Sequence, residues 1–248
     1  MNGILETYKI KHHKEIDGQS INDIELLSCL NNDELALVEQ KCPRSRFKRG
    51  AVLYYEGMRH SGIYCILKGV INLFKIGPLG KEQILRFGHK GDVIAYRSLF
   101  SNEKACSSAK VIEDAIVCYI PHDILMQLFE SNWEFRLCIM KMMCKELRES
   151  NSSVAETALK SVRERTADML LHLHDEFGES DDHYLNIRIT RVQLASRLGI
   201  ATESVIRELT SFKKENLISC NGRQIKILNP DRLKYISDFQ LYQHYRHA

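Results

Sequence analysis

Residues 189–220 read ITRVQLASRLGIATESVIRELTSFKKENLISC, and this stretch decides how the C-terminal part of the chain folds. It predicts two short helices, from Arg191 to Leu198 and from about Thr202 to Asn216, separated by the turn residue Gly199. Thr190 precedes the first helix, where its hydroxyl can accept a hydrogen bond from a first-turn amide. Small and apolar residues recur at helical spacing and are expected to face inward, namely Leu194, Ala195, Leu198, Ile200, Val205, Leu209 and Phe212. The pattern therefore predicts a helix-turn-helix.

The outward face of the second helix carries groups that suit the major groove of DNA. Arg207 can make a bidentate contact to guanine, and Glu203 can accept a hydrogen bond from the amino group of cytosine. We expect base reading by Thr202, Glu203, Ile206 and Arg207, and phosphate contacts by Thr190, Arg191, Lys213 and Lys214. An ordinary helical hairpin in a protein core is the alternative explanation of the same spacing.

Two short strands are expected directly after the second helix. Leu217–Ser219 and Gln224–Leu228 flank Asn221-Gly222, a dipeptide typical of tight hairpin turns. Pro230 ends the second strand, and a short closing helix is expected from Asp231 to Phe239. With this hairpin the predicted unit is a winged helix-turn-helix.

Upstream, from about Arg46 to Pro121, short β-rich runs alternate with glycine, as in AVLYYEG, GIYCILKG and VINLFKIG. Strands at this spacing predict an antiparallel sandwich or barrel. Paired carboxylates, a Ser/His/Asp arrangement, a GxxxxGK[ST] loop and clustered metal ligands are all missing from this region. We therefore expect no enzymatic activity and no metal site here.

A long helix is predicted between the two regions. The run from Asn132 to Leu159 contains neither glycine nor proline, and Ser131 with Glu134 fits a capping box at its start. One face repeats at alternating spacings of three and four and forms a heptad seam, made of Leu137, Met140, Cys144, Leu147, Asn151, Val154 and Ala158. Such a seam favours pairing with a second copy. The alternative is a helix packed only on its own β-domain, and the adjoining face is expected to pack there through Phe135, Ile139, Met142 and Met143.

Composition limits the class of protein. The chain has 248 residues, of which 44% are hydrophobic, enough to fill two cores. No stretch approaches the ~20 apolar residues that cross a bilayer, and the start MNGILETYKIKHHKE lacks a signal-peptide core, so we expect a soluble, cytoplasmic protein without a membrane partner. The eight cysteines form no CxxC pair and indicate reduced thiols. A net charge of +3 does not by itself indicate a nucleic-acid partner.

From about Ile24 to Phe239 the order of these parts resembles the Crp/Fnr family of bacterial transcription regulators. The matching strings are FKRGAVLYYEG, IYCILKGVINLFK, GKEQILRFGHKGDVIAY, EDAIVCYIP and ITRVQLASRLGIATESVIREL. The resemblance implies an α+β fold: a polar extension over 1–20, a cyclic-nucleotide-binding-like antiparallel β-roll over 21–130, a dimerisation helix over 131–159 and a winged helix-turn-helix over 160–248. It also implies a homodimer that binds double-stranded DNA at a palindromic operator, with RNA polymerase as a further partner.

The effector loop departs from the family members that bind cyclic AMP. Those members carry Gly-Glu for the ribose and Arg followed by Ser or Thr for the phosphate, where this chain has Ala95-Tyr96 and Cys106-Ser107. Because both the carboxylate and the cation are missing, cyclic AMP is not expected to bind in that manner. The residues expected to line the effector pocket are Gly91, Ala95, Tyr96, Arg97, Ser98, Cys106 and Ser107.

Gas- and redox-sensing cofactors have little support in the sequence. The closely spaced N-terminal cysteines of oxygen-sensing members are absent, leaving Cys29 and Cys42, too few thiolates for an iron-sulfur cluster. No haem-ligand pattern flanks the scattered histidines, which include His12, His13, His60, His89 and His122. Redox sensing by Cys106 stays open. The effector and any cofactor therefore remain unidentified, and the alternative function is a ligand-binding module whose helix-turn-helix serves protein interaction.

Overall fold

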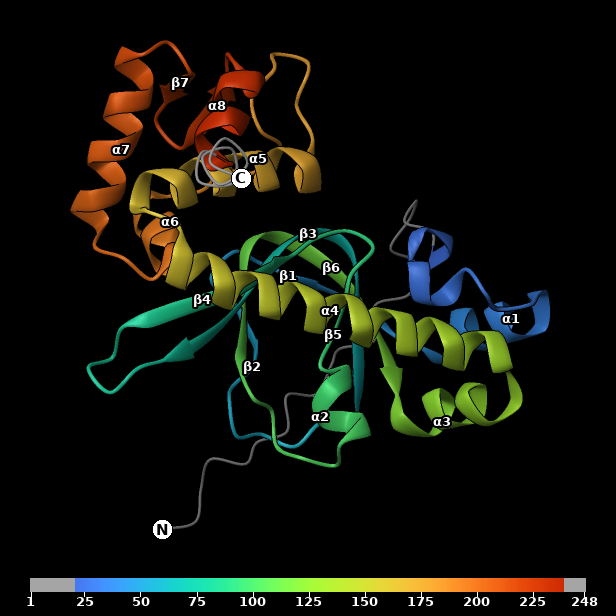
Figure 1. Cartoon of the computed structure of the whole chain (residues 1–248). Coiled ribbons are helices and arrows are strands. Elements are labelled where there is room, and N and C mark those ends of the chain that lie inside the picture. The colour runs from blue at the N-terminus through green and yellow to red at the C-terminus, as the bar shows by residue number, and fades with distance from the viewer. Residues whose placement is uncertain (1–20, 239–248) are drawn as a thin grey trace, which may run out of the picture. The chain divides into compact units, whose positions relative to one another are not determined.

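The computed structural model describes residues 21–238 and divides the chain into two compact units (Figure 1). The first unit contains the residues up to Leu73 together with Phe87–Met143. The second contains Phe74–Arg86 together with the residues from Cys144 onward. The division falls inside the long helix, between Met143 and Cys144. The hairpin formed by Phe74–Arg86 continues from the β-sheet but is grouped with the C-terminal residues.

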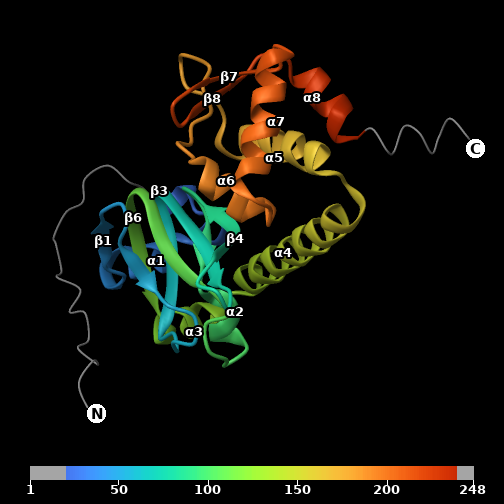
Figure 2. The ribbon, with the colours of Figure 1, turned by 90° about the vertical axis from the view of Figure 1, so that its left-hand side faces the viewer.

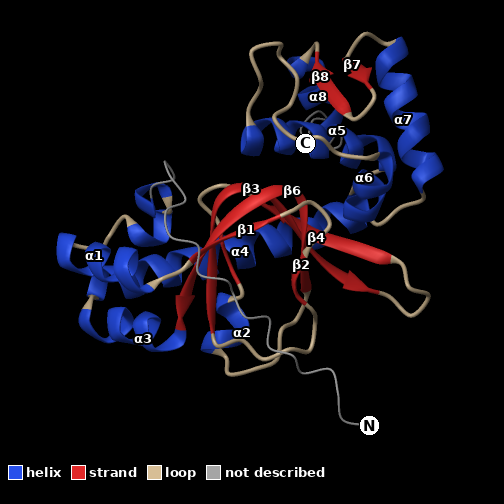
Figure 3. Cartoon of the chain, turned by 180° about the vertical axis from the view of Figure 1, so that it is seen from behind, coloured by secondary structure: helices blue, strands red, loops and turns tan. Residues whose placement is uncertain are grey.

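The β-rich region forms a six-stranded sheet with the strand order β1-β6-β3-β4, in which β2 also pairs with β6 and β5 with β3 (red in Figure 3). The strands β1 and β2 run antiparallel to β6, and β5 runs antiparallel to β3, as the glycine-punctuated runs predicted. The bounds are β1 Arg44–Phe47, β2 Val52–Tyr54, β3 Gly62–Ile76, β4 Glu82–Gly88, β5 Val93–Ile94 and β6 Ser108–Pro121.

Among the described residues of the first unit, hydrophobic side chains pack in two clusters. One packs side chains of the sheet such as Tyr54, Ile71 and Val111 against each other. The other packs the strand residue Ile120 against Phe135 of the long helix and against the surrounding short helices. These helices are the 3-10 helices η1 Ile21–Asp23 and η2 Glu25–Leu27, and the α-helices α1 Asn32–Lys41, α2 Tyr96–Phe100 and α3 His122–Ser131.

The long helix α4 spans Trp133–Leu159. The predicted packing face is confirmed, because Phe135 and Ile139 are buried in the second cluster and Met142 and Met143 pack against it. The predicted cap Ser131 was wrong. Asn132 Oδ1 accepts the hydrogen bond from the Phe135 N–H at 3.0 Å, whereas the Ser131 hydroxyl donates to the carbonyl of the preceding helix turn at Gln127, at 2.9 Å.

The second unit is built on helices with a small β-hairpin. Its elements are α5 Val162–Phe177, α6 Arg191–Leu198, α7 Thr202–Lys214, β7 Ile218–Asn221, β8 Gln224–Ile227 and α8 Pro230–Ser237. The predicted bounds of α6 are confirmed, and α7 ends two residues earlier than expected. Among residues 21–238, no helix is both long enough and apolar enough to cross a membrane.

The hairpin turn and the closing helix differ slightly from their predicted positions. The turn lies at Gly222-Arg223 instead of Asn221-Gly222, because Asn221 pairs with Gln224 as the last residue of β7. The helix α8 begins at Pro230 and not at Asp231, since proline needs no N–H partner in the first turn and Asn229 caps the helix. The predicted helix end at Phe239 lies outside the described residues.

Candidate nucleic-acid interface

The helix-turn-helix is held together by local caps at both ends of α6. Thr190 Oγ1 accepts from the Gln193 N–H at 3.1 Å, and Gln193 Oε1 accepts from the Thr190 N–H at 2.9 Å. Gly199 ends the helix in the left-handed region with φ 68°, and its N–H donates to the carbonyl of Ala195. A residue with a Cβ is strained at this φ, so glycine is the residue that the turn requires. The turn directs the chain into α7.

The helix α7, which Figure 2 shows beside α6, buries one face and exposes the other according to the exposure of its residues. Val205, Leu209 and Phe212 are buried, as predicted. Glu203 and Arg207 are exposed and lie one helical turn apart, so their side chains share a face. Further exposed residues of α7 are Ile206, Lys213 and Lys214, whereas Thr202 is half-buried. This face presents a carboxylate, a guanidinium and a branched apolar side chain side by side.

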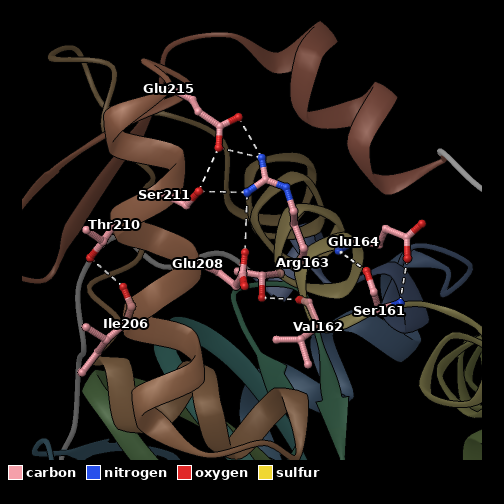
Figure 4. A network of polar contacts seen from close by, with 10 residues as sticks. Ser161, Val162, Arg163, Glu164, Ile206, Glu208, Thr210, Ser211 and Glu215 are labelled. Carbon is pink, nitrogen blue, oxygen red and sulfur yellow. Dashed lines mark hydrogen bonds and ion pairs between the residues drawn. The ribbon is translucent and has the colours of Figure 1, made fainter.

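Arg163 of α5 fixes the position of α7 (Figure 4). Its Nη2 lies 2.8 Å from both carboxylate oxygens of Glu215, directly after the end of α7, and its Nη1 donates to the Ser211 hydroxyl at 3.1 Å. The guanidinium carbon also lies 4.7 Å from the centre of the Phe212 ring. The Arg163 guanidinium, followed by the Ser211 hydroxyl, holds the pKa of Glu215 below its ordinary value. Sequence analysis did not identify Arg163.

The start of α5 and the end of α6 are fixed as well. Ser161 and Glu164 form a reciprocal capping box at the start of α5. Arg165, in the first turns of the same helix, donates through Nη2 to the carbonyl of Leu198, the last residue of α6. Because the last carbonyls of a helix lack intrahelical partners, this guanidinium both satisfies one of them and complements the helix dipole. Thus α5 contacts both helices of the helix-turn-helix.

Arg197 of α6 is half-buried and lies within electrostatic reach of three glutamates. Burial lowers the pKa of its guanidinium, and the carboxylates of Glu176, Glu156 and Glu149 act in the opposite direction. Burial, followed by the charge of Asp168, raises the pKa of Glu156. This arginine therefore links α6 electrostatically to α5 and to the C-terminal half of α4.

The hairpin between β3 and β4 is bonded to α6 within the same compact unit. The hydroxyl of Ser196 donates to the carbonyl of Glu82 at 2.7 Å and accepts from the N–H of Ile84 at 2.9 Å. The Gln83 amide donates to the carbonyl of Arg197 at 3.4 Å. Strand β4 is an edge strand of its sheet, so Ser196 satisfies backbone groups that no further strand pairs with.

The four residues expected to contact phosphate differ in their exposure to solvent. Lys213 and Lys214 are exposed near the end of α7. Thr190 and Arg191 lie at the start of α6 and are half-buried. Arg191 Nη1 is buried, and within residues 21–238 it has no hydrogen-bond partner. Thr190 already uses its hydroxyl to cap α6.

The predicted dimer seam lies on the exposed side of α4. Within a single chain, Met140 is 46%, Leu147 63% and Val154 69% exposed, and Cys144 and Asn151 are exposed too. Leu137 is half-buried, next to the part of the helix that packs on the sheet. A row of large apolar side chains in water is unfavourable by roughly 25 cal/mol per Å² of apolar area. The seam is therefore a surface that a partner could cover.

The expected effector residues do not all face solvent. Ala95 adopts φ 73° and leads into α2, where Tyr96 is buried in the cluster that includes Phe135. Arg97 is exposed, and its Nη2 lies 3.2 Å from Sγ of the exposed Cys106. The remaining expected residues are Ser98 and Ser107, which are buried, and Gly91, which is half-buried. The two exposed side chains, a guanidinium and a thiol, lie together.

Two of the other sensing candidates, His60 and Cys29, are partly buried against protein groups. His60 packs edge-on against the Tyr54 ring with centroids 4.4 Å apart, and burial lowers its pKa. Burial, followed by a hydrogen bond with Cys138, raises the pKa of Cys29 to about 12, so this thiol stays protonated at neutral pH. His12 and His13 lie outside the described residues.

Comparison with known proteins assigns both parts of the chain. Residues 44–132 match the family model of the cyclic nucleotide-binding domain, and residues 164–236 match the Crp-like helix-turn-helix domain. The fumarate and nitrate reduction regulatory protein of Vibrio cholerae is 28% identical over 213 residues, 85% of each chain. The transcriptional activator protein Anr of Pseudomonas protegens is 26% identical over 234 residues, 92% of this chain and 95% of that one.

The chain belongs to the Crp/Fnr family of transcription regulators. Its fold is shared with solved members. FixK2 from Bradyrhizobium japonicum has a TM-score of 0.72 at 22% identity, covering 79% of this chain and 96% of that one. A CRP-family transcriptional regulator from Thermus thermophilus has a TM-score of 0.67 at 20% identity, covering 78% and 96%. The chain is thus a DNA-binding regulator of this family and not an enzyme.

In this Crp/Fnr regulator the position that corresponds to the ribose-binding carboxylate of cyclic-AMP-binding members is Tyr96. This residue is only 3% exposed and belongs to the packed core of the first unit. The position that corresponds to the phosphate-binding arginine is Cys106, which carries no positive charge. Positions 96 and 106 therefore carry neither the carboxylate nor the cation that the cyclic-AMP-binding members have there.

Proposed function

We propose that this regulator reads an inverted-repeat operator as a homodimer, with α7 of each copy in a major groove. The observation that carries the proposal is the exposed pair Glu203 and Arg207, one helical turn apart on α7. Both side chains can reach base edges together, because residues at this spacing lie one above the other on a helix face. The bonds from Arg163 and Arg165 support the proposal, since they hold α7 and α6 in a fixed arrangement.

The base assignments follow from hydrogen-bonding chemistry and from the family resemblance. We assign Arg207 to the guanine and Glu203 to the cytosine of one G·C pair in a TGA-like half-site. Ile206 is 48% exposed beside them, and a branched apolar side chain suits the methyl group of thymine. Thr202 completes the reading set. Lys213, Lys214, Thr190 and Arg191 are assigned to phosphates.

The seam of α4 is assigned to the dimer. A second copy would cover Met140, Cys144, Leu147 and Val154, and Asn151 would set the register of the two helices. A dimer of this kind presents two reading helices related by a twofold axis. Half-sites about one helical turn apart then match the protein in symmetry and spacing.

We assign the control of DNA binding to an effector other than cyclic AMP. The alternative is that contacts within the protein control DNA binding without any small molecule. Strand β3 begins in the first unit and continues into the hairpin whose backbone is bonded to Ser196 of α6. This continuous stretch of chain supports a mechanical route from the sensory domain to the reading motif. Because its target is genomic DNA, we assign the protein to the cytoplasm, with RNA polymerase as its partner at promoters.

Selection of bound sequences from a pool of random DNA tests the proposed function. Purified full-length protein should enrich an inverted repeat of two half-sites with a G·C pair at the same position in each. Enrichment of single half-sites would contradict the homodimer. No enrichment over a pool carried through without protein would contradict sequence-specific reading.

A further inference from the structure

The first residue of α4, Trp133, is the sole tryptophan of the chain and is 61% exposed. Tryptophan is on average a well-buried residue, because its ring is the largest apolar surface that a side chain carries. Where its ring is left in water on the surface of a folded chain, a binding partner that covers it is the usual explanation. The seam expected from the sequence begins at Leu137 and did not include this residue.

The position of Trp133 continues the seam toward the start of α4. Trp133 precedes Leu137 by four residues and Leu137 precedes Met140 by three, so the alternating spacing of the seam is kept. Four residues span about 1.1 helical turns, which places Trp133 above Leu137 on one face. Phe135, two residues further on, lies on the opposite side of the helix and is buried against the sheet. Trp133 therefore belongs to the exposed face.

Arg136 holds the Trp133 ring in place. Its guanidinium carbon lies 5.7 Å from the centre of the ring. Nη1 of the same guanidinium donates to the carbonyls of Phe129 at 3.2 Å and Glu130 at 3.3 Å, near the end of α3. A ring that is restrained before binding loses little side-chain freedom when a partner covers it. Tryptophan and arginine are also the residue types that most often carry the binding energy of protein interfaces.

We propose that a second copy of this chain covers Trp133, so that the dimer contact begins at the first residue of α4. A second copy is the occupant that the spacing favours, because a heptad seam pairs with a helix that carries the same repeat. Trp133, Leu137 and Met140 all belong to the first compact unit. The contact therefore joins the two sensory domains directly, in addition to the seam residues of the second unit. This inference rests on the proposed homodimer and extends it.

Tryptophan fluorescence of the full-length protein tests the proposal, because the emission comes from Trp133 alone. The dimeric wild type is compared with the same protein diluted until sedimentation shows a monomer, and with Leu147→Lys. We expect the dimer to emit at shorter wavelength and to be quenched less by acrylamide than either monomer. Equal emission and equal quenching in dimer and monomer would overturn the proposal and leave the homodimer intact. A wild type that is monomeric at every concentration would contradict the homodimer itself.

Substitution of Trp133 measures its share of the dimer affinity. Trp133→Ala should raise the dissociation constant of the dimer about tenfold or more, as expected for a residue at the centre of a contact. Trp133→Phe should retain most of the affinity. Tyr55→Ala is the matched control, because it removes an aromatic residue of the first unit that is 56% exposed outside the seam. An unchanged dissociation constant in Trp133→Ala, with the fold verified by circular dichroism, would overturn the proposal.

Discussion

Arg163 of α5 lies with Nη2 at 2.8 Å from each carboxylate oxygen of Glu215, directly after the end of the helix α7. The same guanidinium bonds to Ser211 and stacks on Phe212, so one side chain contacts the last two turns of α7. Groups that must meet base edges need a rigid support, because loosely held side chains lose affinity when they are ordered on binding. Arg163 provides this support without itself lying on the face of α7 that is proposed to read DNA.

Arg163→Gln should destabilise the second unit by about 1 to 2 kcal/mol, the sum expected for a well-formed surface ion pair and a cation–π contact. Operator affinity should fall while base preference stays unchanged, because the reading side chains remain present. Urea denaturation and operator titration measure the two effects. Arg59→Ala, which removes an exposed arginine of the first unit, is the control. It should change neither the unfolding free energy nor the operator affinity by a comparable amount. An altered base preference in Arg163→Gln would show that Arg163 itself reads DNA.

The stabilisation by Arg163 should depend on pH. The pKa of Glu215 is held below its ordinary value of 4.5, chiefly by Arg163. A carboxyl with a lowered folded-state pKa contributes stability above its unfolded-state pKa, and this contribution is lost as the pH falls through the folded-state pKa. The difference in unfolding free energy between wild type and Arg163→Gln should therefore be full at about pH 7 and shrink at about pH 3. A difference that is constant across this range would assign the effect to the Phe212 contact.

Ser196→Ala should weaken the bond between the β3–β4 hairpin and α6. Ser196 is 7% exposed, and its removal leaves the carbonyl of Glu82 and the N–H of Ile84 without this partner. We expect a loss of about 1 to 3 kcal/mol in unfolding free energy, typical of buried polar groups left unsatisfied. Hydrogen exchange at the Ile84 amide should also accelerate. Ser150→Ala, at an exposed position of α4, is the control. Unchanged protection at Ile84 would mean that the contact is not maintained in solution.

Leu147→Lys should dissociate the dimer, since it places a charge in the apolar seam of α4, where Leu147 is 63% exposed in the single chain. Sedimentation should show a monomer, and tight binding to a two-half-site operator should be lost with it. Leu79→Lys makes the same chemical change at a residue that is 97% exposed outside the seam. That control should remain dimeric. A Leu147→Lys protein that sediments as an unaltered dimer would mean that the seam has been misplaced.

Cyclic AMP and cyclic GMP should give no saturable heat in calorimetry at millimolar concentration. Tyr96 is buried in the core, and Cys106 offers no cation to a cyclic phosphate. Arg97 is the nearby guanidinium, with Nη2 3.2 Å from the thiol of Cys106. Micromolar binding that Arg97→Ala abolished would contradict this expectation and would identify Arg97 as a phosphate ligand.

Local patterns predicted the DNA-reading motif closely because its determinants are local. Thr190 and Gln193 cap α6 from within four residues, Gly199 supplies the left-handed turn, and the apolar spacing of α7 matches its buried face. The start of α4 shows the limit of such reasoning. Ser131 and Asn132 are both good capping residues. The Ser131 hydroxyl donates to the carbonyl of Gln127 in α3, so Asn132 caps α4 instead.

Contacts between residues far apart in the sequence could not be predicted from local patterns. Arg163 and Glu215 are 52 residues apart, and neither has a sequence pattern that marks the other as its partner. The bond from Ser196 to the hairpin joins residues 112 apart. The effector loop was located by resemblance, but the burial of Tyr96 depends on the packing of α4 against the sheet. These features follow from tertiary packing.

The most direct test of the account is the preference for the G·C pair of the half-site, measured by selection from random DNA with wild type and with Arg207→Ala. We predict that Arg207→Ala loses about 1 to 3 kcal/mol per half-site and relaxes the preference at the guanine. Lys213→Ala should instead weaken all sequences alike and lower the salt slope by about one. A G·C preference that survives Arg207→Ala intact would contradict the placement of α7 in the groove.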